Sequence, residues 1–408
     1  MRVDTMRSLD YWLGIPLTFV ASLLVWVQDK LRGETAPQTK RILFVELSEM
    51  GSTIIADPAM CRAKEKLNAE LYFVIFAKNR PSLELLDTVP RENVFTLRED
   101  SLFTLLVDFV GYLLWCRRQK IDTVVDLELF SRISALMTGL SGAWRRVGFH
   151  AFHNEGLWRG FMLTHRVSYN PHQHIAKNFI ALIHSLETPE MEVPFAKTRI
   201  SDADIQLRQR DFSEEELSAI RSKVNSSIAP FDLNDKRIVL INPNASELLP
   251  QRRWAKERYA ELMRQLLDKH SDIVILITGA PAERIEAEAL KQSCNHVRVI
   301  NFAGSVKFAE LPALYAISTL MVTNDSGPGH FSAITPLKTF VLFGPETPAL
   351  YGSLGNSTPI WAGLACAPCV SASNHRKTPC HQPACMNAIS VEQVETLVSV
   401  YLAQISNC

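Results

Sequence analysis

The chain has 408 residues, a length that predicts two or three domains. Hydrophobic residues make up 47% of it and charged residues 21%, which is typical of a globular protein that builds real cores. Lys plus Arg and Asp plus Glu number 43 each, so no overall field attracts nucleic acid, and we expect no nucleic-acid partner.

The first predicted element is an uncharged stretch at residues 11–27, YWLGIPLTFVASLLVWV. It is slightly shorter than the roughly 20 apolar residues that cross a bilayer. Pro16 favours a broken or re-entrant start, and Trp12 and Trp26 suit interfacial positions. A buried core helix is the alternative, but such helices usually carry a polar stripe. A cleaved signal peptide is a second alternative, although no small-residue cleavage site follows.

We therefore expect residues 1–40 to be a membrane-associating segment, either spanning or monotopic. Basic residues follow the apolar stretch, and they predict that the main body lies on the cytoplasmic side of the inner membrane. These residues are Lys30, Arg32, Lys40 and Arg41.

Residues 41–195 alternate apolar runs with helical patterns. The run RILFVEL at 41–47 ends in SEMGST, and a helical pattern begins near Asp57. Strands alternating with helices predict a parallel, doubly wound α/β sheet. The other predicted strands of this domain are residues 69–76, 122–129 and 145–149.

The same alternation restarts after a charged stretch at 196–235, which we expect to be an irregular linker. We expect a second α/β domain at 236–390 and a C-terminal helix at 391–408. Ligands of such sheets bind at the carboxyl ends of the strands. The predicted strands lie within 237–245, 272–283, 297–304, 320–325 and 338–345, with helices at 254–270 and from about Lys307. Neither half contains G-x-G-x-x-G or a Walker loop, which argues against a nicotinamide enzyme or a P-loop NTPase.

Several stretches in this order resemble motifs of glycosyltransferase family 9, the family of the lipopolysaccharide heptosyltransferases. They include INPNASELLPQRRWAKERYAEL, ITGAPAE, TLMVTNDSGPGHFSAI and FGPETP in the second half. ILFVELSEMGSTIIADPAM and VVDLELFSRISALMTGLSGAWRRVGF resemble the first half of the family. The resemblance covers about residues 41–395.

This resemblance implies a GT-B fold, in which two Rossmann-like domains with parallel sheets face each other. The N-terminal domain would bind the acceptor and the C-terminal domain a nucleotide-sugar donor. It also implies inverting transfer, independent of metal and of any cofactor, to a glycolipid acceptor at the cytoplasmic membrane face. Heptose from an ADP-linked donor is the default sugar.

The departing diphosphate needs positive charge and N–H donors. Asp325, Ser326, Gly327 and His330 lie where a strand meets a helix, and the glycine lets the backbone approach closely. Asn244 and Ser246 form a second polar turn after residues 237–243. We therefore expect both turns to bind the donor.

Two arginines follow the second turn. The family's basic residue before the Trp maps to Arg252, which we expect to act in catalysis, with Arg253 beside it at the donor. Alternatively, they are solvated arginines at a helix start. Thr278 and Glu283 bracket the TGAPAE turn, and Glu283 could accept the ribose hydroxyls or only compensate the helix dipole.

The base position departs from the family pattern. The family places Asp directly after the Gly of the first loop, and this chain has Ser52, which cannot act as a base at neutral pH. Glu49 is our first candidate for the base and Glu46 the second, both on the acceptor side, whereas Asp57 would only charge the helix start. Alternatively, Glu49 is structural, or the chain is a catalytically inactive relative that binds nucleotide-sugar or glycolipid.

The sequence suggests two further site types. Cys366, Cys369, Cys380 and Cys385 have the ligand number of a structural zinc site, and reduced thiols are the alternative. A serine hydrolase built from Ser326, Asp325 and His330 is disfavoured, because G-x-S-x-G is absent and adjacent Asp and Ser cannot form a triad with a His on the same turn.

Overall fold

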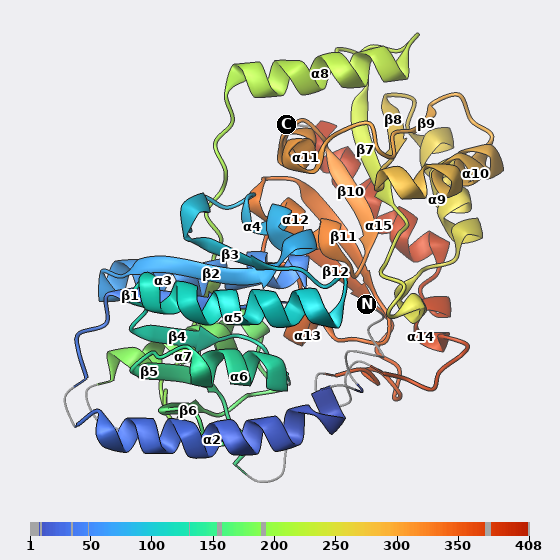
Figure 1. Ribbon diagram of the computed structural model, residues 1–408. Helices are drawn as coiled ribbons and strands as arrows, with labels where there is room; N and C mark the ends of the chain where they lie inside the picture. The colour runs from blue at the N-terminus through green and yellow to red at the C-terminus, as the bar shows by residue number, and fades with distance from the viewer. Residues whose placement is uncertain are drawn as a thin grey trace. The chain divides into compact units, whose positions relative to one another are not determined.

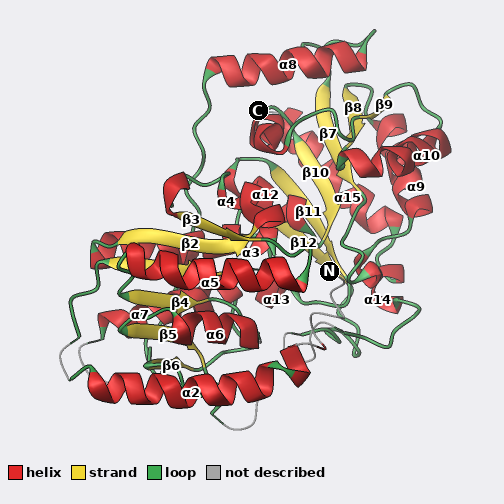
Figure 2. Ribbon diagram, in the orientation of Figure 1, coloured by secondary structure: helices red, strands yellow, loops and turns green. Residues whose placement is uncertain are grey.

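The computed structural model describes residues 8, 10–33, 36–47, 49–129, 131–152, 157–188, 193–371 and 377–406. Contacts between Cα atoms divide the chain into two compact units, Met1–Gln206 and Leu207–Cys408. Each unit contains one six-stranded sheet in which every pair of strands is parallel, with helices on both faces (Figures 1 and 2). The α/β class with parallel sheets is therefore confirmed.

The sheet of the first unit has the order β3-β2-β1-β4-β5-β6. Its centre is apolar on both sides, as a parallel sheet covered by helices requires. Phe44 of β1 pairs with Phe73 of β2 and with Val125 of β4. The strands are β1 (Arg41–Val45), β2 (Glu70–Phe76), β3 (Val94–Leu97), β4 (Thr123–Asp126), β5 (Arg145–Phe149) and β6 (His165–Val167).

Two sets of helices cover this sheet. α3 packs against α7 and α4, whereas α2 packs against α6, which also contacts α5. Figure 1 shows α5, α6 and α2 side by side, with α6 in the middle. The helices are α2 (Gly14–Leu31), α3 (Met50–Leu67), α4 (Arg80–Leu83), α5 (Leu102–Arg118), α6 (Arg132–Leu140) and α7 (Ile175–Glu187).

The sheet of the second unit has the order β12-β11-β10-β7-β8-β9. Val322 of β10 pairs with Ile241 of β7 and Phe340 of β11, so β7 and β10 are central. Their carboxyl ends lie next to each other at the same edge of the sheet. The strands are β7 (Arg237–Asn242), β8 (Ile273–Ile277), β9 (Val299–Asn301), β10 (Leu320–Asn324), β11 (Lys338–Phe343) and β12 (Ser357–Trp361).

The helices of the second unit include a group that buries the larger core, in which α9 packs against α10 and α15. Trp254, just before α9, and Tyr259, in the first turn of α9, are fully buried in this core. The helices are α8 (Glu214–Ile228), α9 (Lys256–Lys269), α10 (Arg284–Cys294), α11 (Leu311–Ala316), α12 (Gly327–Phe331), α13 (Pro348–Tyr351), α14 (Ala384–Asn387) and α15 (Val391–Ser406).

The structure corrects three expectations about elements. Residues 196–235 are not irregular throughout, because they contain α8, which begins at a capping box formed by Ser213 and Glu216 and packs on α11. Pro16 does not interrupt the N-terminal helix, since it lies in the first turn of α2, where a missing N–H removes no helical hydrogen bond. Asp57 lies well inside α3 rather than at its start, and it is buried.

Candidate functional site

The second unit brings a buried charge cluster to the carboxyl edge of its sheet. Arg252 donates from Nη2 to Glu346, and its Nε lies 3.5 Å from Oδ2 of Asp325. Asp325 directly follows β10, and Glu346 follows β11 in the GPETP turn. The cluster, named here the Arg252 cluster, therefore joins one arginine to two acids from neighbouring strand ends.

Burial and charge set the protonation of the Arg252 cluster. Burial alone would lower the pKa of Arg252, but the charges of Asp325 and Glu346 outweigh it and raise that pKa. Burial raises the pKa of Glu346 to about 8, an effect that Asp325 increases and Arg252 opposes. Burial therefore favours the protonated form of Glu346, and the two acids share the single guanidinium of Arg252.

The turn after Asp325 has vacant backbone donors beside this cluster. Ser326 is the N-cap of α12, and Gly329 N–H donates to Ser326 O. Within the described ranges, no hydrogen bond uses the N–H of Ser326 or of Gly327. Because α12 spans only Gly327–Phe331, its dipole is small, and the individual N–H groups matter more than the helix field.

Asparagines hold these strand ends together. Asn324 Nδ2 donates to Pro243 O at 2.8 Å, and its Oδ1 accepts from Tyr259 Oη at 3.0 Å. Asn242 Nδ2 donates to Oγ1 of Thr278 at 3.2 Å and so ties the end of β7 to that of β8. Sequence reasoning missed both asparagines and Glu346, although Glu346 lies in the FGPETP stretch that carried the family resemblance.

Gly279 lies where the turns after two neighbouring strands meet. A Cβ at this glycine would lie 2.9 Å from Nδ2 of Asn244 and 2.9 Å from Oε2 of Glu283, so the turn after β7 and the turn after β8 converge there. Glu283 Oε2 also accepts from the backbone N–H of Ala280 at 2.6 Å, and burial raises the pKa of this glutamate. The Glu283 side chain therefore accepts a hydrogen bond at the start of the helical turn that precedes α10. It also lies close to the turn that follows β7.

Other predicted donor residues have different surroundings. Arg253 donates to Ala245 O at 2.7 Å and pairs with Glu247, so it braces the turn that contains the exposed Ser246. Ser326 Oγ donates to Asn324 O, and Asp325 faces Arg252, so these two side chains do not form a hydrolase triad with His330.

The first unit places the acceptor-side candidates where β1 meets α3. Glu46 follows β1 and is buried, and Glu49 is the N-cap residue of α3 with a partly exposed side chain. Ser52 lies in the first turn of α3 and is also partly exposed. Asp57 is enclosed deeper in α3, where it accepts from Thr88 Oγ1. Glu49 and Ser52 are therefore the accessible members of this group.

A buried ion pair lies at the end of β4 in the same unit. Arg159 donates from Nη2 to Asp126 and from Nη1 to Glu128 O at 2.9 Å. Burial raises the pKa of Asp126 to about 6, although Arg159 opposes the shift. Glu128 Oε1 accepts from the backbone N–H of Leu47 at 2.9 Å, which connects this cluster to the loop after β1.

The four late cysteines are not arranged as a metal site. Within the described ranges no group of three or more His, Cys, Asp or Glu side chains could hold a metal ion. Cys366 is exposed, Cys380 donates to Gln382 O, and Cys385 is buried. His375, a further potential ligand next to these cysteines in the sequence, lies outside the described residues.

The family model and the curated relatives agree on one family. A family model described as glycosyltransferase family 9 (heptosyltransferase) matches residues 116–378. Lipooligosaccharide heptosyltransferase 2 of Campylobacter jejuni serotype O:2 is 28% identical over 227 residues, which are 52% of this chain and 68% of that protein.

Solved structures agree on the fold. The structure of Escherichia coli ADP-heptose lipopolysaccharide heptosyltransferase II is similar, with a TM-score of 0.67, 18% identity and coverage of 90% of this chain and 99% of that one. A family 9 glycosyltransferase from Veillonella parvula also gives a TM-score of 0.67, at 16% identity, with coverage of 91% and 99%. The fold is therefore GT-B, as expected.

Proposed function

Because this chain belongs to glycosyltransferase family 9, we propose that it transfers a heptose from an ADP-linked donor to a lipopolysaccharide-type or other cell-envelope glycolipid. The observation that carries the proposal is the Arg252 cluster beside the vacant N–H groups of Ser326 and Gly327, at the sheet edge where α/β proteins bind ligands. The names of the Campylobacter and Escherichia relatives support heptose as the sugar.

The leaving diphosphate would be stabilised by Arg252 and these amides. Arg252 is largely buried, so its charge acts in a medium of low dielectric constant, where it is worth more than in water. No metal ion is needed if this cation and the N–H donors neutralise the departing charge. Thr278, Asn244 and Glu283 would hold the nucleoside, with the Glu283 carboxylate accepting from ribose hydroxyls.

Glu49 would act as the general base. Its carboxylate would take the proton of the acceptor hydroxyl while that oxygen attacks the anomeric carbon from the face opposite the diphosphate. The new C–O bond forms as the bond to the diphosphate oxygen breaks, so the anomeric configuration inverts and the nucleoside diphosphate leaves. Glu46 is buried, which makes it the weaker candidate.

The membrane location is proposed from α2, the one helix within the described residues that is long and apolar enough to cross a bilayer. Its packing favours a monotopic arrangement instead of a span. Asp10, just before α2, pairs with Arg132, and Asp29 Oδ2 accepts from Nη2 of Arg146 at 2.5 Å. Between these two ion pairs, a stripe of small residues lies against α6, so the helix is attached along its whole length. The inner-membrane cytoplasmic face remains the proposed site of action.

Two measurements test the function. Calorimetric titration of the purified chain with ADP should show binding, and mass spectrometry should detect a glycolipid that has gained heptose. Glu49→Gln should keep ADP binding but lower turnover by about 10²–10⁴-fold, the usual contribution of a general base. Glu65→Gln, an exposed position on the same helix, is the matched control and should leave both unchanged.

A second function is supported by one observation. Ser52 occupies the first turn of α3 at the position where the family has Asp, so the chain could bind nucleotide-sugar or glycolipid without turning it over. ADP binding without transfer to any envelope glycolipid fraction would favour this non-catalytic role. Absence of ADP binding would overturn the donor site itself.

A further inference from the structure

The outer side of α5 is apolar where a helix of a water-soluble protein is usually polar. Phe103 is 75% exposed and Leu114 is 64% exposed. Arg98 holds Asp108 by an ion pair at 2.7 Å, so the one acid within α5 is neutralised. A helix that is apolar all round is normally buried or placed in a membrane. The exposed apolar residues of α5 are Leu102, Phe103, Leu106, Val107, Val110 and Leu114.

This stripe continues across α6 to α2. Ile133, Leu136 and Leu140 lie on one side of α6 at helical spacing, and all three are half-buried. α6 contacts α2 on one side and α5 on the other (Figure 1). The outer side of α2 is also apolar, with Trp26 60% exposed. We call the outer side of these three helices the three-helix face.

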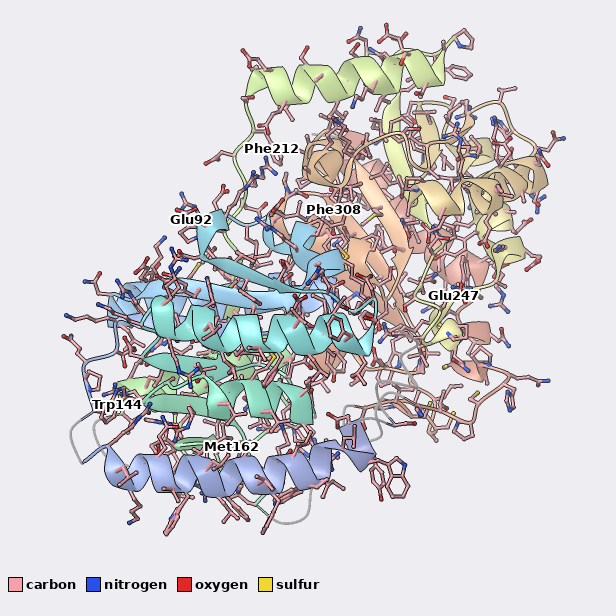
Figure 3. The ribbon with its side chains drawn as sticks, in the orientation of Figure 1. Glu92, Trp144, Met162, Phe212, Glu247 and Phe308 are labelled. Carbon is pink, nitrogen blue, oxygen red and sulfur yellow. The ribbon has the colours of Figure 1, made fainter. Side chains whose placement is uncertain are left out.

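A basic pocket lies at the carboxyl ends of the same helices. Its volume is about 780 Å³, and its lining includes five cations and two acids. Arg32 forms one wall, donating to Gly142 O at 2.7 Å and stacking 5.1 Å over the ring of Trp144, whose position at the end of α2 is seen in Figure 3. The charged lining residues are Arg32, Lys40, Arg41, Arg117, Lys120, Glu70 and Asp122.

The two acids of the pocket compensate only part of its positive charge. Asp122 accepts from the backbone N–H groups of Lys40 and Arg41, and Glu70 pairs with Arg41 at 3.1 Å. Across the described part of the chain, neither Arg117 nor Lys120 has an ion pair. The pocket therefore keeps an excess of positive charge next to an apolar face.

We propose that the three-helix face lies on a bilayer and that the pocket holds the phosphate of an anionic lipid headgroup. A monotopic surface of this kind buries apolar side chains at the acyl boundary and keeps its cations at headgroup level. The cations at the edge favour a lipid surface over a second copy of the chain, because an anionic leaflet attracts them whereas an identical face repels them. Trp12 and Trp26 suit the same depth.

This inference rests on the proposed membrane location but on no catalytic step. The test is co-sedimentation of the full chain with vesicles of phosphatidylcholine, alone or mixed with phosphatidylglycerol, without donor or acceptor. The native chain should bind both and prefer the anionic vesicles. Leu106→Gln/Leu114→Gln changes exposed positions only, and it should weaken binding to both kinds of vesicle.

The pocket is tested by Arg117→Gln/Lys120→Asn. Asn suits position 120 because its φ is +54°. This variant should lose only the preference for anionic vesicles, by about fivefold for each cation removed, which corresponds to about 1 kcal/mol per charge. Lys64→Gln/Lys66→Gln, exposed on α3, and Ile285→Gln, exposed on α10, are the matched controls and should bind as the native chain does.

Three results would overturn the proposal. The first is unchanged vesicle binding by the α5 variant, and the second is an unchanged anionic preference of the pocket variant. The third is a dimer in light scattering that dissociates in Leu106→Gln/Leu114→Gln while the native chain does not bind vesicles, which would assign the face to a second copy. If the chain binds vesicles as expected but transfers no sugar, the proposed glycosyl transfer is contradicted and the membrane inference is not.

Discussion

Asn324 Oδ1 accepts a hydrogen bond from the backbone N–H of Trp254 at 3.1 Å, across 70 positions of sequence. This bond joins the end of β10 to the segment just before α9. Arg252, two residues before the tryptophan, donates from Nη1 to Asp325 O at 3.5 Å. Asn324 therefore fixes the distance between the guanidinium and the turn at Ser326. It is a positioning residue of the proposed donor site.

Asn324→Ala should reduce both stability and donor binding. The side chain is fully buried, and its removal leaves Trp254 N–H, Tyr259 Oη and Pro243 O without this partner. Each unsatisfied buried group costs about 1–3 kcal/mol, so a loss of about 3 kcal/mol in the free energy of unfolding is expected. Urea unfolding measures the loss, and calorimetry should show weaker ADP binding. Asn356→Ala, at an exposed position, is the control, and an equal effect there would contradict the positioning role.

Arg252→Ala should damage catalysis far more than Arg253→Ala. The first substitution removes the cation beside the vacant N–H groups, whereas Arg253 only braces its own turn and pairs with the exposed Glu247. A loss of about 10²–10³ in kcat/KM is expected for Arg252→Ala, as for a lost donor to a developing oxyanion. Arg252→Lys should recover part of this, because it keeps the charge but not the forked geometry. Equal kinetic losses at the two arginines would remove Arg252 from its proposed role.

Glu346→Gln should remove a pH dependence of stability. The folded pKa of Glu346 is raised to about 8 from an ordinary value of 4.5. Between these two values the unfolded chain has lost the proton while the folded chain keeps it, so the native protein loses stability as pH rises through this window. Urea unfolding between about pH 5 and pH 8.5, roughly the same interval, should show that the free energy of unfolding declines less in the variant than in the native chain. If the free energies of unfolding of the native chain and the variant differ by the same amount at every pH, the raised pKa of Glu346 is contradicted.

The central strands were predictable because both faces of a parallel sheet are covered, which makes each strand a continuous apolar run. RRVGF corresponds to β5 without an error in bounds, and the expected stretch 320–325 contains β10. The strands that sequence reasoning missed are β3, β6 and β12. All three are edge strands with half-buried residues, such as the HRV of β6, so their sequences lack the continuous apolar run.

The candidate site was predictable only in part. Strand ends and turn residues identified Asp325 and Asn244, because polar turns after apolar strands are visible in the sequence. The Arg252–Glu346 pair joins positions 94 apart, and nothing local marks either residue as a partner of the other. The sequence LFTLLVDFVGYLLWC shows that α5 is rich in apolar residues, but only their exposed fractions in the structure show which of them face outward.

Removing Arg159 should lower the free energy of unfolding more at neutral and higher pH than at acidic pH. Asp126 is fully buried, and Arg159 is the cation that opposes the rise of its pKa to about 6. In Arg159→Leu the folded pKa should rise further, so the carboxyl keeps its proton in the folded chain over a wider range and the variant loses stability as pH increases. Breaking a buried pair costs about 3–5 kcal/mol when one charge is left alone.

Unfolding measured at pH 5 and pH 8, roughly either side of that value, should therefore show a larger deficit for Arg159→Leu at the higher pH. The double variant Asp126→Asn/Arg159→Leu has no carboxylate to leave unpaired, so it should recover much of the loss at pH 8, roughly to the level of the single variant at pH 5. If the double variant were as unstable as Arg159→Leu at the higher pH, the bonds of Arg159 to Glu128 O and Ser131 O would explain its role, and the charge of Asp126 would not.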